Sequence, residues 1–250
     1  MTPGAALVTG AGARLGRAMA EALGADGWAV CVHYRGSKAE AEATAAAIRR
    51  SGGRAEILSA DLADEASRDG LLAEAARRLG RPVTLLVNSA ATFADDTATE
   101  HSRADWDHHI EPNLRAPVHL AQQFAGQLPP GEKGLIVNLI DQRVWKLTPQ
   151  FFTYTLSKAA LWSATQTLAQ ALAPNIRVNA IGPGPTLANV HQSPEAFAAE
   201  QAATLTGEGA SPAEIARALR YLVAATSVTG QMIACDGGQH LMWQTPDTAV

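Results

Sequence analysis

Continuous apolar runs alternate with alanine-rich stretches along the whole chain, and this alternation constrains the fold more than any other feature. Runs typical of β-strands cover residues 5–9, 28–33, 55–59, 85–88, 135–140, 176–181 and 232–234. Stretches with helical character cover 14–25, 38–50, 65–79, 106–127, 155–172 and 212–224. Because the apolar runs are continuous, the strands should be covered on both faces, as in a mostly parallel sheet with helices above and below. The sequence predicts one doubly wound α/β domain with a seven-stranded sheet, spanning residues 1–250.

Composition and charge exclude several classes of protein. Of the 250 residues, 47% are hydrophobic and 18% are charged, and the formal net charge is -4. Lysines and arginines form no cluster, so the sequence predicts neither a nucleic-acid-binding groove nor binding to an anionic membrane surface. No apolar run approaches the ~18 residues that span a bilayer, and the first strand begins too close to Met1 to leave room for a signal peptide. We expect a cytoplasmic protein.

Cysteines and histidines show no spacing typical of a metal site. Cys31 and Cys235 each lie inside an apolar segment without a CxxC partner, so we expect two buried thiols with no redox or metal role. His108 and His109 are adjacent and point to different faces of a helix, which predicts that both lie on the helix surface. No metal is predicted.

A glycine-bearing turn, TGAGARLG at residues 9–16, follows the first apolar run and precedes a helix. Glycines permit close approach of the backbone, and the first amides of the helix then point at an anionic group. This arrangement binds the pyrophosphate of a dinucleotide, although a plain tight turn is the alternative. Arg14 meets the positive end of the helix dipole, which is unfavourable unless an anion or a polar substrate lies in front of it. We expect ligand contacts from Gly10, Arg14 and Leu15.

The end of the second strand distinguishes between the two nicotinamide dinucleotides. An enzyme that selects NAD usually places an acidic residue here to bind the ribose 2′-hydroxyl. This chain has hydroxyl, guanidinium and ammonium groups instead, in the segment VHYRGSK at residues 32–38. The segment favours NADP, bound through Tyr34, Arg35 and Ser37, over the alternative of a solvated basic turn. The ends of the third and fourth strands are expected to contact the adenine and its ribose, through Asp61, Leu62, Asn88, Ser89 and Ala90.

Three residues in the second half of the chain form an acid/base group. Tyr154 and Lys158 are spaced i, i+4 and so lie on one face of a helix, where the ammonium can hold the phenolate near neutral pH. Asp141 precedes them. The alternatives are an exposed helix pair for Tyr154 and Lys158, and a capping or turn carboxylate for Asp141. Together with the dinucleotide turn, the group predicts a redox enzyme with a small-molecule substrate.

The chain resembles the short-chain dehydrogenase/reductase family over essentially its whole length. The matching elements are the turn at 9–16, NSA at 88–90, Asn113, Tyr154 with Lys158, RVN at 177–179 and PG at 183–184. The resemblance implies a Rossmann-like sheet, hydride transfer with a nicotinamide cofactor, and a homotetramer. It implies that Tyr154 is the acid/base, and that Lys158 holds the cofactor ribose and lowers the tyrosine pKa. It also implies that Asn113 anchors a water for proton relay.

Departures from the family pattern resemble its pteridine reductase branch, and bacterial dihydromonapterin reductases share several of them. That branch has an arginine in the cofactor turn, His-Tyr after the second strand, an aspartate in place of the usual serine, and a phenylalanine that stacks on the pterin. The corresponding residues here are Arg14, His33, Tyr34, Asp141 and Phe93. A core aromatic is the alternative for Phe93. The resemblance places Pro183, Gly184 and Thr186 at the cofactor, and it implies a serine where this chain has Ala91.

The carboxylate of Asp141 is the feature on which the choice between the functional hypotheses depends. A carboxylate repels a developing alkoxide and suits a basic, nitrogen-rich substrate, so the leading hypothesis is an NADPH-dependent pteridine reductase. The alternatives are a ketone or quinone reductase in which Asp141 stays protonated, and a non-catalytic NADP-binding sensor. Prolines at 183, 185 and 194 and a glycine break at 207–209 predict a substrate lid over residues 183–211. Further candidates for the substrate pocket are Trp145, Phe151, Phe152 and His191.

Overall fold

The computed structural model describes residues 1–189 and 192–245 of the chain. The strands of these residues form one parallel sheet in the order β3-β2-β1-β4-β5-β6-β7. They are β1 (Ala5–Val8), β2 (Ala29–Tyr34), β3 (Arg54–Ser59), β4 (Val83–Asn88), β5 (Gly134–Leu139), β6 (Ile176–Pro183) and β7 (Met232–Cys235). The seven-stranded, doubly wound prediction is confirmed, and each strand agrees with its expected bounds to within two residues.

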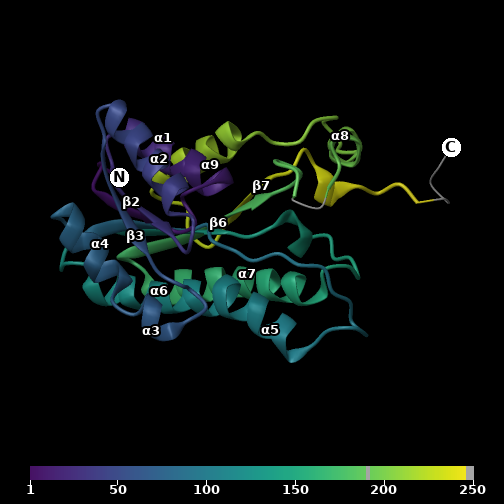
Figure 1. Ribbon diagram of the computed structural model, residues 1–250, viewed down its shortest axis with the longest axis horizontal. Coiled ribbons are helices and arrows are strands. Elements are labelled where there is room, and N and C mark those ends of the chain that lie inside the picture. Colours follow the sequence, from purple (N-terminus) through teal and green to yellow (C-terminus); the bar gives the residue numbers. More distant parts are fainter. Residues whose placement is uncertain (190–191, 246–250) are drawn as a thin grey trace.

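Helices cover both faces of the sheet. They are α1 (Arg14–Ala25), α2 (Lys38–Arg50), α3 (Glu65–Arg68), α4 (Leu71–Leu79), α5 (Arg103–Ile110), α6 (Ala116–Gln127), α7 (Phe152–Leu172), α8 (Pro194–Ala202) and α9 (Pro212–Ala224). Three short helices are η1 (Glu111–Arg115), η2 (Gln142–Val144) and η3 (Gln239–Leu241). In Figure 1, α1, α2 and α9 form one layer, and α3 to α7 form the layer on the opposite face.

Two of the predicted helices are interrupted. The stretch 65–79 is divided into α3 and α4 because Gly70 adopts a left-handed conformation with φ of 69°, which ends one helix before the next begins. The stretch 106–127 belongs to a longer unit that begins at Arg103, and in it the π-helical turn η1 separates α5 from α6. π-helical turns are rare and frequently lie at functional sites, and this one contains Asn113.

Two hydrophobic clusters lie on the two faces of the sheet. Successive residues of β1 alternate between them: Ala6 and Val8 belong to the cluster under α1 and α9, whereas Ala5 and Leu7 belong to the cluster under α4 and α6. All four are fully buried. The apolar continuity of the strands therefore follows from burial on both faces, as the sequence predicted.

The strand order reverses between β1 and β4, which are neighbours in the sheet although β2 and β3 lie between them in the chain. The crossovers leave this point in opposite directions, so a crevice opens at the carboxyl ends of the two strands. The loops that follow β1, β2, β4 and β5 meet at this crevice.

No helix of the described residues is long and apolar enough to cross a membrane. Among the same residues, no group of three or more histidine, cysteine, aspartate or glutamate side chains is arranged to hold a metal ion. Cys31 is buried on β2, where burial raises the pKa of its thiol to about 12. Cys235, at the end of β7, is only partly buried, and burial raises the pKa of its thiol to about 11.

Candidate active site

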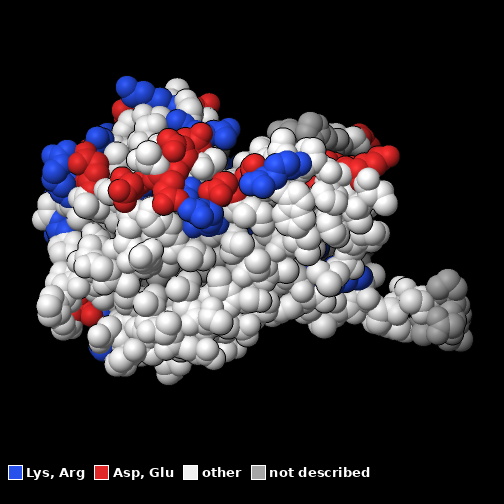
Figure 2. Space-filling view, turned by 90° about the horizontal axis from the view of Figure 1, so that it is seen from below, with Lys and Arg blue, Asp and Glu red and all other residues white. Residues whose placement is uncertain are grey.

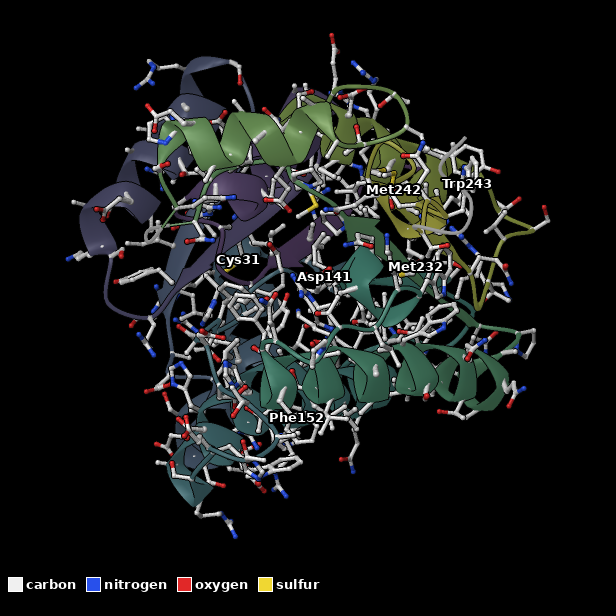
Figure 3. The ribbon with its side chains drawn as sticks, turned by 90° about the vertical axis from the view of Figure 1, so that its right-hand side faces the viewer. Cys31, Asp141, Phe152, Met232, Met242 and Trp243 are labelled. Carbon is white, nitrogen blue, oxygen red and sulfur yellow. The ribbon has the colours of Figure 1, made fainter. Side chains whose placement is uncertain are left out.

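A cavity of about 850 Å³ lies at the carboxyl edge of the sheet. Its lining includes most of the side chains and turns that the sequence predicts for the site: Gly10, Arg14, Leu15, His33, Tyr34, Arg35, Ser37, Asp61, Leu62, Ser89, Ala90, Phe93, Asp141, Tyr154, Lys158, Pro183, Gly184 and Thr186. These residues come from distant parts of the chain, and the sheet brings them to one edge. Figure 3 shows Asp141 near the centre of the molecule, between α7 and the opposite helical layer.

Two predicted site residues lie outside the lining. Asn88 is buried at the end of β4, and its amide Nδ2 donates to Oδ1 of Asn138 on β5 at 2.8 Å. Asn113 is fully buried, and its side chain both accepts from the amide of Thr92 and donates to the carbonyl of Thr92. The side chain of Asn113 thus holds the loop after β4, and its expected part in a proton relay stays a prediction.

The turn between β1 and α1 is shaped by close packing. A Cβ on Gly16 would lie 2.3 Å from the carbonyl oxygen of Gly10, so only glycine lets the helix begin this close to the turn. The amide of Gly10 donates to Nδ1 of His33 at 3.1 Å. Nε2 of the same ring lies 3.1 Å from the carbonyl of Ala60, and it donates there because Nδ1 is the acceptor. His33 therefore links the turn to the end of β3, and burial lowers its pKa to about 4.

The first turn of α1 has no side-chain cap. The N-cap residue is Ala13, whose side chain has no hydrogen-bond acceptor, whereas α5 and α9 each begin with a capping box at Ser102 and Ser211. Amides of α1 at this end remain available to an anion, as the glycine turn predicts. The guanidinium of Arg14 donates instead to the carbonyls of Leu187 and Ala188, at 3.0 and 2.9 Å. Arg14 thereby connects the turn to the segment after β6.

The far end of the cavity suits the phosphate-bearing ribose of NADP. Tyr34, Arg35 and Ser37 follow β2 and line it with hydroxyl and guanidinium groups. Arg35 is exposed, and no acidic residue occupies residues 34–38. This donor set fits a 2′-phosphate, since a guanidinium binds phosphate through charge-assisted hydrogen bonds.

Tyr154 and Asp141 form the polar centre of the cavity. The tyrosine hydroxyl donates to Oδ2 of Asp141 at 3.0 Å, and the backbone amide of Arg143 donates to Oδ1 at 2.8 Å. Burial raises the pKa of Asp141. Burial and the neighbouring Asp141 carboxylate also raise the pKa of Tyr154 well above its ordinary value of 10. The pair therefore retains the phenol proton, so Tyr154 can act as a proton donor.

Lys158 lies one helical turn after Tyr154 and is held by a backbone carbonyl. Its Nζ donates to the carbonyl of Leu139 at 2.8 Å and lies 5.8 Å from the centre of the Tyr154 ring. Burial lowers the pKa of Lys158 to about 8, against the opposing effect of Asp141. Burial and the Asp141 carboxylate raise the pKa of Tyr154, and the expected lowering of that pKa by Lys158 stays a prediction.

Aromatic rings form one wall of the cavity. The ring of Phe93 stacks on Phe151 with centroids 4.5 Å apart and meets Tyr154 edge to face at 4.8 Å. Phe93 is 39% exposed, so it is no core aromatic. The guanidinium of Arg143 lies 5.0 Å from the Phe151 ring on the same wall. A flat ring system would find an apolar face here.

Two residues with strained backbone lie in the lining. Arg14 and Phe151 are the non-glycine residues of the described chain with positive φ, at 52° and 54°. Such a conformation costs on the order of 1–3 kcal/mol and persists at functional sites where the surroundings enforce it. Arg14 lies at the dinucleotide end of the cavity, and Phe151 lies at the aromatic wall.

Some lining residues have no signal in the sequence. Glu200 on α8 accepts from Gln192 at 2.8 Å and from Gln239 at 3.1 Å, and all three line the cavity. They lie in three separate segments, so no spacing connects them. Of the further pocket candidates, Phe151 lines the cavity, Trp145 and Phe152 do not, and His191 lies outside the described residues.

Known proteins share this fold. A family model described as enoyl-(acyl carrier protein) reductase matches residues 10–240. The 3beta-hydroxysteroid dehydrogenase 1 of Eggerthella lenta is 33% identical over 246 residues, which cover 94% of this chain and 93% of the relative. The chain belongs to the short-chain dehydrogenase/reductase family.

Two similar solved structures contain the cofactor. The FolM alternative dihydrofolate reductase 1 of Brucella suis, in complex with NADP, is 48% identical with a TM-score of 0.95, and the match covers 100% of both chains. The landomycin C-6 ketoreductase LanV, with bound NADP and rabelomycin, is 31% identical with a TM-score of 0.86, covering 96% of this chain and 98% of that chain. The predictions of an NADP cofactor and of an NADP-dependent oxidoreductase are confirmed. Because the relatives are named for different reactions, the substrate has to be argued from the site.

Proposed function

We propose that this chain is an NADPH-dependent reductase that transfers a hydride to a pteridine or to a similar flat nitrogen heterocycle. The observation that carries the proposal is the hydrogen bond between Tyr154 and Asp141, next to the aromatic wall of Phe93 and Phe151. A carboxylate at this position opposes a developing alkoxide but suits a ring nitrogen that gains a proton. The FolM relative, named as an alternative dihydrofolate reductase, supports this substrate class.

The protein supplies the proton, and bound NADPH supplies the hydride to the carbon of a C=N bond. Tyr154 donates its hydroxyl proton to the ring nitrogen as the hydride reaches the adjacent carbon, so the nitrogen builds up little negative charge beside Asp141. The remaining phenolate faces Asp141, and two adjacent buried negative charges are unfavourable, so the pair recovers a proton before the next turnover. Asp141 thus favours return of the phenol proton.

The residues at the other end of the cavity would hold the cofactor. The amides of the β1–α1 turn and Arg14 suit the pyrophosphate, while Tyr34, Arg35 and Ser37 suit the 2′-phosphate. Lys158 is the candidate for the nicotinamide ribose. Ala91 also lines the cavity, and it offers no side-chain hydrogen bond where the pteridine reductase branch has serine.

A carbonyl reductase is the second candidate. Burial raises the pKa of Asp141, and a protonated carboxyl group can donate a hydrogen bond to a carbonyl oxygen. The LanV relative is named as a ketoreductase and the Eggerthella relative as a hydroxysteroid dehydrogenase.

The two candidates are separated by NADPH oxidation with dihydrobiopterin, dihydromonapterin, dihydrofolate and a panel of ketones and quinones. We expect turnover of a pterin by the wild type. Asp141→Ser should lower pterin turnover at least ~10-fold, because a hydrogen bond to a charged group is worth about 1.5–3 kcal/mol, and it should maintain or raise ketone reduction. Asp141→Asn, which keeps the size but removes the charge, should show the same reversal. A wild type that reduces ketones well and no pterin would establish the carbonyl reductase instead.

We propose in addition that residues 1–250 form a single NADP-binding domain with a substrate lid at residues 183–211. The single sheet supports the first part, and the cavity contacts of Leu187, Phe197 and Glu200 support the second. Val190 and His191, within the lid range, lie outside the described residues. The cytoplasmic location expected from the sequence stays a prediction.

A homotetramer is also proposed. Lys158 is the one charged residue in α6 and α7, and it is buried. Figure 2 views the side of the molecule where these helices lie, and a broad uncharged area occupies much of it. An uncharged helical surface suits contact with a second copy of the chain.

A further inference from the structure

His109 is buried, contrary to the expectation that it lies on the helix surface. It is fully enclosed at the end of α5, and the side chain uses both ring nitrogens. Nε2 lies 3.1 Å from the amide nitrogen of Ala94, and Nδ1 lies 2.7 Å from Oγ1 of Thr153. The ring therefore connects the loop after β4 to the start of α7.

The loop after β4 is held at alternate residues. The amide of Thr92 donates to Asn113 at 2.8 Å, the amide of Ala94 donates to His109, and Asp96 accepts from the amide of Thr153 at 3.1 Å. Phe93 lies between two of these attachments. Its own side chain points into the cavity, where it contacts Phe151 and Tyr154 through their rings.

The hydrogen-bond partners of His109 determine which of its two ring nitrogens carries the proton. A backbone amide can only donate, so Nε2 of His109 is an unprotonated acceptor and Nδ1 carries the proton. Nδ1–H then donates to Oγ1 of Thr153, whose own hydroxyl donates to Asp96. The charged or titratable groups around the ring are Asp96, Asp105, His108 and Tyr154. Burial lowers the pKa of His109, in agreement with a neutral ring.

We propose that His109 is a positioning residue, which holds Phe93 in the cavity wall and thereby sets the affinity for flat aromatic substrates. The proposal rests on the proposed function insofar as Phe93 is the stacking surface for the substrate. His109 does not line the cavity, although its ring packs edge to face against the ring of Tyr154 with centroids 5.9 Å apart. Its effect reaches the substrate through the amide of Ala94 and the ring of Phe93.

Two substitutions separate the two hydrogen bonds of the ring. His109→Gln places an amide oxygen near the position of Nε2 and can still accept from Ala94. His109→Asn places its amide near Nδ1, so it can reach Thr153 but not Ala94. We expect His109→Asn to raise the KM for dihydrobiopterin about five- to tenfold, as loss of a buried backbone partner implies, with kcat within twofold. For His109→Gln, both KM and kcat should stay within about twofold of the wild type. The Kd for NADPH should be unchanged in both variants.

A double-mutant cycle with Phe93→Ala tests the route of the effect. If His109 acts through Phe93, then His109→Asn has no further effect on KM once Phe93 is alanine. The proposal would be overturned if the effects of His109→Asn and Phe93→Ala on KM multiply in the double variant. It would also be overturned if His109→Gln and His109→Asn have equal KM values. Thr153→Val is the second variant should His109→Asn not fold, and it is expected to raise KM because it leaves Nδ1–H of His109 without its acceptor and removes the side-chain hydrogen bond to Asp96.

Crystal structures of the Gln and Asn variants keep this inference distinct from the proposed function. The Phe93 ring should stay stacked on Phe151 in His109→Gln and leave it in His109→Asn. An unmoved ring in both variants refutes the positioning role, whatever the substrate. If the ring moves as expected but the wild type reduces no pterin, the pteridine assignment fails while the positioning role stands.

Discussion

At the residue scale, Tyr154 and Asp141 act as a pair. The 3.0 Å hydrogen bond between them and their burial leave the tyrosine protonated, which suits a group that delivers a proton during reduction. The neighbouring carboxylate, when ionised, opposes a developing alkoxide, which is the basis of the proposed preference for a ring nitrogen.

Tyr154→Phe should remove at least ~99% of turnover, since general acid catalysis contributes about 10²- to 10⁴-fold. The Kd for NADPH should change little because the hydroxyl transfers a proton and does not hold the cofactor. Steady-state rates and fluorescence titration with NADPH measure the two effects. Lys158→Ala is the matched comparison and should damage both. A Tyr154→Phe enzyme that keeps more than about a tenth of its rate would contradict the assignment.

Arg35 is expected to decide the choice of dinucleotide. Its contact with the 2′-phosphate should be worth on the order of 1.5–3 kcal/mol, so NADPH should be preferred over NADH by at least about tenfold in kcat/KM. Arg35→Asp should erase the preference. Arg81→Asp makes the same charge change at an exposed residue outside the cavity and should leave it intact. Equal use of NADH by the wild type would refute the phosphate-binding role.

At the scale of elements, the β1–α1 turn depends on a side chain from β2. His33 accepts from the amide of Gly10 and donates to the carbonyl after β3, so three segments share one imidazole. The ring has to be neutral to accept from Gly10. The geometry of the pyrophosphate turn therefore has a dependence on pH that the glycines alone would not give.

Stability should fall on acidification between about pH 6.5 and 4. The pKa of His33 is about 4 when folded and 6.5 at its ordinary value, so the unfolded chain binds more protons in this window. The linked stabilisation is fully present above pH 6.5, and about 3 kcal/mol of it is lost as the pH falls towards 4. Urea unfolding at pH 7.5, 6 and 5 measures the slope. The free energy of unfolding of His33→Gln should depend less steeply on pH than that of the wild type. Equal slopes would show that protonation of His33 is not the cause of the pH dependence.

At the scale of the whole molecule, α6 and α7 form a helical surface that exposes no lysine, arginine, aspartate or glutamate of their own. The outer faces of α6 and α7 include Val118 and Leu156, which are 37% and 38% exposed. The uncharged area in Figure 2 lies on this side, whereas the charged residues in that view gather along one border. An uncharged face of this kind can be buried against a partner more easily than a charged one, because no ionised side chain has to lose its water.

Leu156→Arg should dissociate the expected tetramer into smaller species, because it places a charge on that face. Leu147→Arg, at a position that is 69% exposed and outside α6 and α7, is the matched control and should leave the assembly unchanged. Analytical ultracentrifugation distinguishes the outcomes. A monomeric wild type, or dissociation by the control alone, would show that the face serves another purpose.

The sequence by itself determined the features that depend on neighbouring residues. Burial on both faces makes strand residues continuously apolar, so the sheet was predictable to within two residues at each strand end. The glycine turn and the Tyr154–Lys158 spacing are equally local. The cavity lining could be inferred from them because parallel strands bring their carboxyl ends to one edge.

Only the tertiary structure decided where polar side chains find their partners. His109 has the sequence context of a surface histidine, yet its partners Ala94 and Thr153 come from other segments. Asn88 bonds to the adjacent strand and does not line the cavity. The pKa of Tyr154 rises because packing removes water and places a carboxylate beside it. Hydrogen bonds and desolvation depend on atoms brought together from distant parts of the chain, and no local pattern records them.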